Sequence, residues 1–237
     1  MLILALDTSD LRGSVALLRE ETVLETESHN TTEDYSSWLL PAVIRVLAAA
    51  GVELQQVDVF AAAAGPGSFT GVRVGLVTVK AWAEVYRRGI VAVSRLEALA
   101  RESSGGAPYV APFFDAGRNQ VFGALFHRRG SELQRLEDEM VMAPDQFLDW
   151  CRAKTAGERF DLISTDPQGP AETPHWASRL TASETIEVVS PTLAPRIGKI
   201  GYQRAVLGQL IDALALDANY VRRSDAELFR KGSAHAG

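Results

Sequence analysis

The sequence lacks the features that mark secreted and membrane-spanning proteins. Its 237 residues include one cysteine, Cys151, so no disulfide can form within the chain. No run of about 18 apolar residues occurs, which argues against a membrane-spanning helix. The N-terminus has no basic region and reaches Asp7 too early for a signal peptide. We therefore expect a cytoplasmic protein that makes no membrane contact.

Histidine is scarce, and this scarcity limits the chemistry that the chain can perform. The four histidines are His29, His127, His175 and His235. No two of them lie one helical turn apart, as in a metal-binding helix. No G-x-S-x-G motif supports serine hydrolysis. Cys151, next to Trp150 on an apparent helix, is typical of a thiol packed in a core. We predict no metal site and no catalytic residues.

Positive charge is also in short supply, which argues against a chain that binds nucleic acid by itself. The 24 Lys and Arg residues stand against 30 Asp and Glu, a formal net charge of −6. Contacts to phosphates need a cationic surface. The C-terminal region is the exception, because from residue 195 onward basic residues (Arg196, Lys199, Arg204, Arg222, Arg223, Arg230, Lys231) outnumber acidic ones (Asp212, Asp217, Asp225, Glu227). A solvated helix face accounts for this excess, and contact with RNA is the alternative.

The expected elements follow the same order twice along the chain. The first set has strands at 2–8, 13–19 and 22–29, a helix at 34–51, a strand at 57–64, a helix at 70–88 and a strand at 90–93. A capped helix at 94–102 and a linker, Ser103-Ser-Gly-Gly-Ala-Pro108, come next. The second set has strands at 109–114, 120–127 and 132–136, a helix at 144–156 and a strand at 160–164.

This repetition predicts an α/β fold of duplicated βββαβα domains, the ribonuclease-H-like or actin-like architecture. We place the first domain at residues 1–104 and a second, smaller domain at 108–237. Asp7 and Asp115 end the first strand of each set, and we expect them to face one another across the cleft between the domains. A helix expected from about 194 to 216, interrupted near Gly208, would return to pack on the first domain.

The most distinctive motif is Ala64-Gly-Pro-Gly-Ser-Phe-Thr-Gly-Val-Arg-Val-Gly75, between an expected strand and an expected helix. The N–H groups in the first turn of a helix lack partners and favour an anion. Thr70, however, stands where a GxGxxG motif has its third glycine, and no P-loop lysine follows. Two interpretations stay open: a phosphate site, or a tight corner between strand and helix.

A vestigial nucleotide or phosphate site would combine this loop with the end of the first strand. Its members would be Asp7, Thr8, Ser9, Gly65, Gly67, Ser68 and Thr70. In actin-like kinases and ATPases the corresponding strand end binds the phosphates of a magnesium nucleotide. The alternative is that Asp7 and Thr8 fix the turn by local hydrogen bonds. We expect no bound cofactor, with a nucleotide as the one candidate ligand.

The two expected helices at 34–51 and 70–88 are apolar on almost every side. A helix that covers one sheet face needs only one apolar stripe. The second apolar face therefore indicates either a partner protein or deep burial within the monomer. Two glycines four residues apart would allow another backbone to approach closely. The candidate interface residues are Trp38, Gly71, Val72, Gly75, Leu76, Val79 and Trp82.

The string GPGSFTGVRVG, with Leu6-Asp-Thr-Ser9 and Leu39-Leu-Pro41 before it, resembles the bacterial TsaB (YeaZ) family of tRNA threonylcarbamoyladenosine biosynthesis proteins. That family is related to the TsaD/Kae glycoprotease-like family. Asp217-Ala-Asn-Tyr-Val-Arg222 resembles the closing P-x-Y-L-R motif of the same family. The catalytic relatives bind a metal through two histidines one turn apart. The matching helix, which begins Glu33-Asp-Tyr35, has none.

The resemblance implies an actin-like fold and a non-catalytic scaffold or activating subunit of the tRNA modification complex. It implies a TsaD-like transferase as partner through the helical face, a TsaE-like ATPase in the same complex, and a homodimer when the chain is alone. It implies contact with tRNA only through the complex. The alternatives are an actin-like ATPase or kinase, a glycoprotease-like (M22-type) peptidase, and a homodimeric nucleotide sensor.

Overall fold

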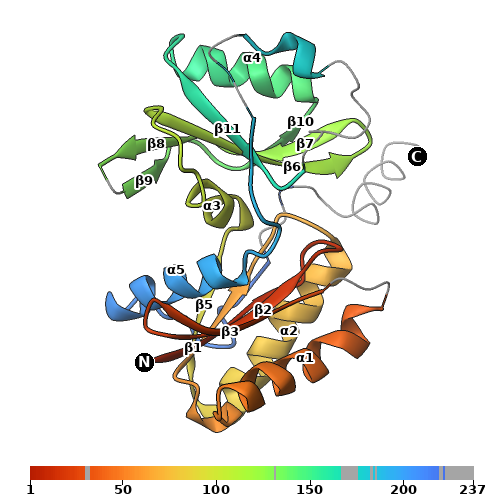
Figure 1. Ribbon diagram of the computed structural model, residues 1–237, viewed down its shortest axis with the longest axis vertical. Helices are drawn as coiled ribbons and strands as arrows, with labels where there is room; N and C mark the ends of the chain where they lie inside the picture. Colours follow the sequence, from red (N-terminus) through yellow and green to blue (C-terminus); the bar gives the residue numbers. More distant parts are fainter. Residues whose placement is uncertain are drawn as a thin grey trace, which may run out of the picture.

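The computed structural model describes residues 1–29, 33–130, 132–166, 176–181, 184, 186–218 and 221, which form two lobes (Figure 1). The first lobe is built on a five-stranded sheet in the order β3-β2-β1-β4-β5. The second is built on a seven-stranded sheet with the main order β10-β7-β6-β11-β12, from which β8 and β9 branch at β6.

The first lobe follows the expected order of elements. Strands β1 to β3 are antiparallel, and β1, β4 and β5 are parallel. Its elements are β1 (Leu2–Asp7), β2 (Ser14–Arg19), β3 (Thr22–Ser28), α1 (Tyr35–Ala49), the 3-10 turn η1 (Leu54–Gln56), β4 (Val59–Ala63), α2 (Phe69–Tyr86) and β5 (Gly89–Val93).

The second lobe differs from expectation in its antiparallel part. The strand expected at 120–127 is two strands, β7 and β8, which pair with β10 and β9 respectively as well as with β6. Its elements are β6 (Tyr109–Gly117), β7 (Gln120–Gly123), β8 (Phe126–Arg129), β9 (Glu132–Arg135), β10 (Met140–Met142), α4 (Pro144–Lys154), β11 (Phe160–Ser164), the 3-10 turn η2 (Trp176–Arg179) and β12 (Ile186–Val188). Helix α3 (Arg95–Ala100) connects the lobes, and α5 (Ala194–Val206) returns to the first lobe.

Helices cover both faces of the first sheet, which explains why β1 is buried on both sides. Successive side chains of a strand point to opposite faces. Ile3 and Ala5 pack with α5, whereas Leu4 and Leu6 pack with α1 and α2. Figure 1 shows α5 on one side of this sheet, α1 and α2 on the other, and α3 between the lobes. None of the helices described here has the length and apolarity to cross a membrane.

Helix α5 ends close to the interruption expected at Gly208, and it does not resume afterwards as the sequence suggests. It ends at Val206, and Gly208 adopts a left-handed φ of 70° that closes the last turn. The chain then runs along the open edge of the first sheet, where Ile211 and Ile90 exchange backbone hydrogen bonds of 2.9 Å. This bridge satisfies backbone groups that an exposed edge strand would leave unpaired.

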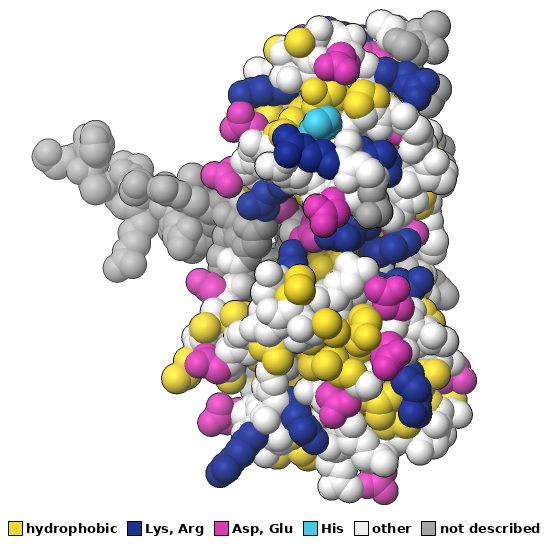
Figure 2. Space-filling view, turned by 90° about the vertical axis from the view of Figure 1, so that its left-hand side faces the viewer, with side chains coloured by type: hydrophobic (Ala, Val, Ile, Leu, Met, Phe, Trp, Pro, Cys, Tyr) yellow, Lys and Arg dark blue, Asp and Glu magenta, His cyan; other side chains and the backbone are white. Residues whose placement is uncertain are grey.

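The junction between the lobes is rich in charged side chains on the face that carries α5. Figure 2 shows basic and acidic side chains crowded at mid-height on this face and hydrophobic ones gathered below them. Two ion pairs link α5 to the region of α3, Arg204 with Glu97 and Arg196 with Glu102, each at 2.5 Å. These pairs help to hold α5 beside the connection between the lobes.

The glycine motif at 65–75 forms a tight corner that rests on the end of β1. Thr8 Oγ1 donates a hydrogen bond to Gly71 O (2.6 Å), and Ser68 N donates to Ser9 O (2.7 Å). A Cβ atom on Gly71 would lie 2.1 Å from Thr8 O, and one on Gly75 would lie 2.5 Å from Thr8 Oγ1. The chain segment that approaches these two glycines closely is therefore the end of β1, in the same lobe.

We predict that Gly71→Ala lowers the free energy of unfolding by about 1–3 kcal/mol, because the added methyl group overpacks the corner. Gly106→Ala is the matched control, since its nearest neighbour, Arg159 Nη2, would lie 3.8 Å from the new Cβ. Denaturant unfolding followed by circular dichroism measures both. Equal stability of the two variants would show that the corner tolerates a side chain.

Candidate functional site

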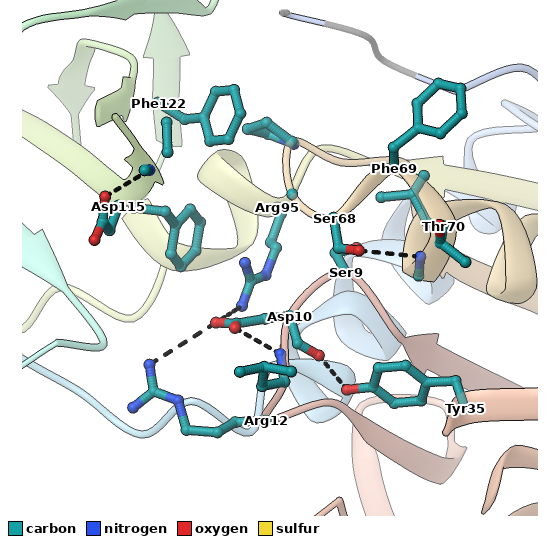
Figure 3. Close-up of a pocket in the computed structure, with 18 of the residues that line it drawn as sticks. Ser9, Asp10, Arg12, Tyr35, Ser68, Phe69, Thr70, Arg95, Asp115 and Phe122 are labelled. Carbon is teal, nitrogen blue, oxygen red and sulfur yellow. Dashed lines mark hydrogen bonds and ion pairs between the residues drawn. The ribbon is translucent and has the colours of Figure 1, made fainter. Parts of the chain in front are cut away.

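A cleft of about 1130 Å³ separates the two lobes on one side of the molecule. The first lobe contributes the turn after β1, the start of α1 and the corner before α2. The second lobe contributes the end of β6, the turn to β7 and the residues that follow β11. Figure 3 shows these side chains converging on the cleft from both lobes. This volume suits a small-molecule ligand.

An arginine lies at the base of the cleft between two carboxylates. Arg95 is 2% exposed, and its Nε donates to Asp7 Oδ2 at 3.1 Å. Its Nη2 donates to Asp10 Oδ2 at 2.9 Å. Asp7 is fully buried, and its Oδ1 accepts the Ser9 N–H at 2.9 Å. A buried carboxylate needs such a counter-charge, because an unpaired charge is costly away from water.

Asp10 is held in its charged form by the same arginine. Burial by itself raises the pKa of Asp10, but the charge and hydrogen bond of Arg95 outweigh burial. The Leu11 N–H and the charge of Arg12 add to this effect. The pKa of Asp10 therefore lies below its ordinary value of 3.8. Figure 3 shows Asp10 between the two arginines.

A small aromatic cluster fixes the turn that carries Asp10. The Tyr35 hydroxyl donates to Asp10 O and accepts the Gly13 N–H at 2.7 Å. Burial, together with the charge of Asp7, raises the pKa of Tyr35 well above its usual range, so the hydroxyl keeps its proton. The His29 ring packs on Tyr35 and lies within hydrogen-bond distance of Leu11 O (2.7 Å) and Glu33 O (2.8 Å). His29 therefore joins the turn to the start of α1.

Asp115 lies on the opposite wall of the cleft, at the end of β6. Its Oδ1 accepts the Gly117 N–H at 2.7 Å, across a bulge in the strand. In Figure 3 its carboxylate points away from Arg95 and Asp10. The partner that neutralises Asp7 is therefore Arg95, which the sequence analysis did not single out. No local signal distinguishes Arg95, because α3 contains a second charged residue, Glu97.

The residues predicted for a vestigial phosphate site come together at the first-lobe wall. Ser9, Gly67, Ser68 and Thr70 line the cleft, whereas Asp7, Thr8 and Gly65 are buried behind them. Two groups of the loop are used internally: the Ser68 side chain caps α2 by accepting the Gly71 N–H at 3.3 Å, and Ser68 N donates to Ser9 O. The Ser9 Oγ is buried and has no hydrogen-bond partner among the described residues. The contacts of Ser68 favour the tight corner, and the phosphate site stays a prediction.

The residues predicted for the partner interface point mostly inward. Trp38, Val72, Leu76 and Val79 are buried in the core between the helices and the first sheet, so the choice of these side chains as outward anchors is wrong. Trp82 is half-buried, with its ring 5.6 Å from that of Phe60. The large apolar side chains that α1 and α2 do expose are Leu40, Ile44, Phe69, Val77 and Val85.

The residues present do not fit a metal-bound ligand. In the described ranges, no three His, Cys, Asp or Glu side chains are grouped to hold a metal ion. Cys151 packs in the core of the second lobe, where burial raises the pKa of its thiol well above the usual range. A protonated, buried thiol is a poor nucleophile.

Some residues singled out in the sequence lie outside the described residues. They are His175, His235, Asn219 and the basic residues from Arg222 onward.

Comparison with known proteins gives matches to proteins of tRNA threonylcarbamoyladenosine biosynthesis. A family model described as TsaD, tRNA N6-adenosine threonylcarbamoyltransferase, matches residues 22–174. The tRNA threonylcarbamoyladenosine biosynthesis protein TsaB of Bacillus subtilis (strain 168) is 36% identical over 146 residues. That match spans 61% of this chain and 64% of the Bacillus protein, less than two thirds of its length.

Solved structures extend the likeness over nearly the whole chain. An uncharacterized protein with similarity to peptidase YeaZ from Pseudomonas aeruginosa matches with a TM-score of 0.76 at 28% identity, covering 93% of this chain and 99% of that one. The activator of the 2-hydroxyisocaproyl-CoA dehydratase from Clostridium difficile matches at 0.51 and 8% identity, over 88% of this chain and 97% of its own. The fold is actin-like, as the repeated order of elements predicted.

We predict that Asp10→Asn lowers stability at neutral pH and that its difference from wild type shrinks as the pH falls below 3.8. A carboxylate whose pKa is lowered in the folded state stabilises above its unfolded pKa and loses that contribution as it becomes protonated. Thermal unfolding from pH 7 to pH 3 measures the effect. The fully exposed Asp138, changed to Asn, is the control. If the stability difference between Asp10→Asn and wild type stayed constant with pH, the lowered pKa of Asp10 would be contradicted.

Proposed function

Because the chain belongs to the TsaB (YeaZ) family of tRNA threonylcarbamoyladenosine biosynthesis proteins, which is related to the TsaD transferases, we propose that it is a non-catalytic scaffold or activating subunit of the tRNA modification complex. It would pair with a TsaD-like transferase that carries the reacting groups. A TsaE-like ATPase would join the same complex. The modified base is the adenine beside the anticodon, and tRNA would be contacted only through the assembled complex.

The observation that carries this proposal is an apolar face on the outside of the first lobe. Residues four apart on a helix share one face. Leu40, Ile44 and Ala48 are exposed at this spacing on α1, and Val77, Ala81 and Val85 are exposed at the same spacing on α2. Helices α1 and α2 pack against one another and lie on the same side of the first sheet. We call these six residues the outer apolar face.

Exposed apolar rows on two neighbouring helices support association with another protein. The face is composed of aliphatic side chains, and the rims carry charges such as Arg45, which pairs with Glu27, and Glu84. An apolar centre with a polar rim is the usual anatomy of an interface. The same face would serve the homodimer of the isolated chain and the heterodimer with a TsaD-like transferase, so that the two would compete.

We expect that the isolated protein neither hydrolyses ATP nor cleaves peptides above background, because Asp7 is buried against Arg95 and the loop has no P-loop lysine. Rates measured with and without Mg²⁺ test this. Asp7→Ala should leave both rates at background. Turnover that is robust in wild type and disappears in Asp7→Ala would instead favour the ATPase, kinase or peptidase alternatives.

We predict that Val77→Glu and Ile44→Glu each weaken the homodimer by about tenfold or more, because a charge would be desolvated at the centre of an apolar interface. The same variants should weaken binding to a TsaD-like transferase. Sedimentation equilibrium measures the first effect and titration calorimetry the second, with circular dichroism to verify folding.

Val206→Glu is the matched control for the interface test. Val206 is 60% exposed and Val77 is 64% exposed, but Val206 ends α5 on the opposite side of the first sheet. The control should dimerise and bind the transferase as wild type does. Folded Val77→Glu and Ile44→Glu proteins that still form both complexes would place the interface elsewhere.

A further inference from the structure

The end of β1 presents a charge problem that the fold solves with its own side chains. Asp7 is fully buried, and Asp10 follows it on the turn that enters the cleft. Two carboxylates so close would repel one another unless a cation lay between them. A divalent metal ion is one solution, because it prefers carboxylate oxygens. In this chain the Arg95 guanidinium contacts both carboxylates.

We propose that Arg95 is a built-in cation of the cleft: its guanidinium takes the place of a divalent metal ion between Asp7 and Asp10, and with Arg12 it holds the two lobes together in the absence of any ligand. The cleft is thereby closed to metal nucleotides, and the angle between the lobes is set by the chain itself.

The charges at the base of the cleft balance without an external ion. Asp7 and Asp10 supply two negative charges, and Arg95 and Arg12 supply two positive ones, with Arg12 Nη2 at 3.8 Å from Asp10 Oδ2. A metal ion that bound these carboxylates would have to displace the Arg95 guanidinium. Arg95 would then remain buried without a partner, which is strongly unfavourable. The fixed fork of a guanidinium is well suited to contact two carboxylates at once.

The same two arginines make contacts to the second lobe. The guanidinium of Arg95 lies over the ring of Phe114, on β6, with its carbon 4.0 Å from the ring centroid. Such a cation over an aromatic face is attractive, and more so away from water. Arg12 crosses the cleft to the end of β11, where Nη1 donates to Thr165 O (3.2 Å) and Nη2 to Thr165 Oγ1 (3.3 Å).

The same two arginines therefore neutralise the carboxylates and join the two lobes. In an enzyme of this fold, a ligand in the cleft would bring the lobes together; here Arg95 and Arg12 join strand ends of both lobes directly. A subunit that presents a fixed surface to a partner gains from this arrangement, because its shape does not depend on a ligand. Neither arginine belongs to the outer apolar face, so the experiment below is independent of the partner test.

Arg95→Ala tests the proposal through its response to metal. Without metal its melting temperature should fall by about 6 °C or more, as expected when a buried ion pair loses one partner. Millimolar Mg²⁺ or Mn²⁺ should restore part of this loss by binding the exposed carboxylates, whereas wild type should not respond. The radius of gyration from small-angle X-ray scattering should increase in the variant, because the contact with Phe114 is lost. Arg12→Ala should open the lobes in the same way.

Two further variants keep the test decisive if Arg95→Ala folds poorly. Asp7→Asn/Arg95→Ala removes the buried charge together with its partner, so it should melt higher than Arg95→Ala and should not respond to Mg²⁺. Arg101→Ala is the control, a part-buried arginine paired with Glu97 outside the cleft at 3.2 Å. It should show neither a response to Mg²⁺ nor a change in radius.

Three results would overturn the proposal. The first is an Arg95→Ala protein with unchanged radius and no response to Mg²⁺. The second is a double variant as unstable as Arg95→Ala, which would show that Arg95 does not serve the charge of Asp7. The third is a wild-type protein that Mg²⁺ stabilises and whose response disappears in Asp7→Asn, which would place a metal ion where we place the guanidinium.

Discussion

The buried carboxylate of Asp7 is the constraint on which the centre of this molecule depends. A charge that is fully excluded from water requires a cation and hydrogen-bond donors close by. The Ser9 N–H provides one donor, and Arg95 provides the cation. Arg95 can reach Asp7 only because α3 begins between the lobes, directly after β5. The position of α3 between the lobes therefore also neutralises the buried charge at the end of β1.

The glycine corner before α2 also contributes to the burial of Asp7. Because Gly67 and Gly71 have no side chains, the backbone before α2 lies directly on Thr8 and Ser9, and water is kept from Asp7 beneath. Close packing accounts for the glycines of the motif, and Ser68 caps its own helix while its N–H bonds to Ser9 O. The phosphate site at this loop stays a prediction. A glycine-rich turn before a helix allows another group to approach the backbone closely, and here the approaching group is the end of β1.

Much of the fold could be predicted from the sequence, because strands and helices differ in the period of their apolar residues. The repeated order of elements was sufficient for the actin-like architecture. The split of β7 from β8 was missed, because the two halves of one extended run pair with different strands, β7 with β10 and β8 with β9. The inward side of α1 and α2 was missed for another reason. When a helix is apolar on nearly all sides, the sequence does not indicate which side packs against the sheet.

The role of Arg95 could not be predicted at all, since nothing local distinguishes an arginine that reaches a buried carboxylate 88 residues away from one that faces solvent. Its importance follows only from the topology, which places the starts of α2 and α3 and the end of β1 at one edge of a parallel sheet. In enzymes of α/β folds this edge is where ligands bind. Here the chain has filled the position with its own cation, the Arg95 guanidinium, while the outer apolar face lies on α1 and α2. Under our proposal this cation replaces a ligand in holding the lobes, and the fixed shape that results is what a binding partner can use.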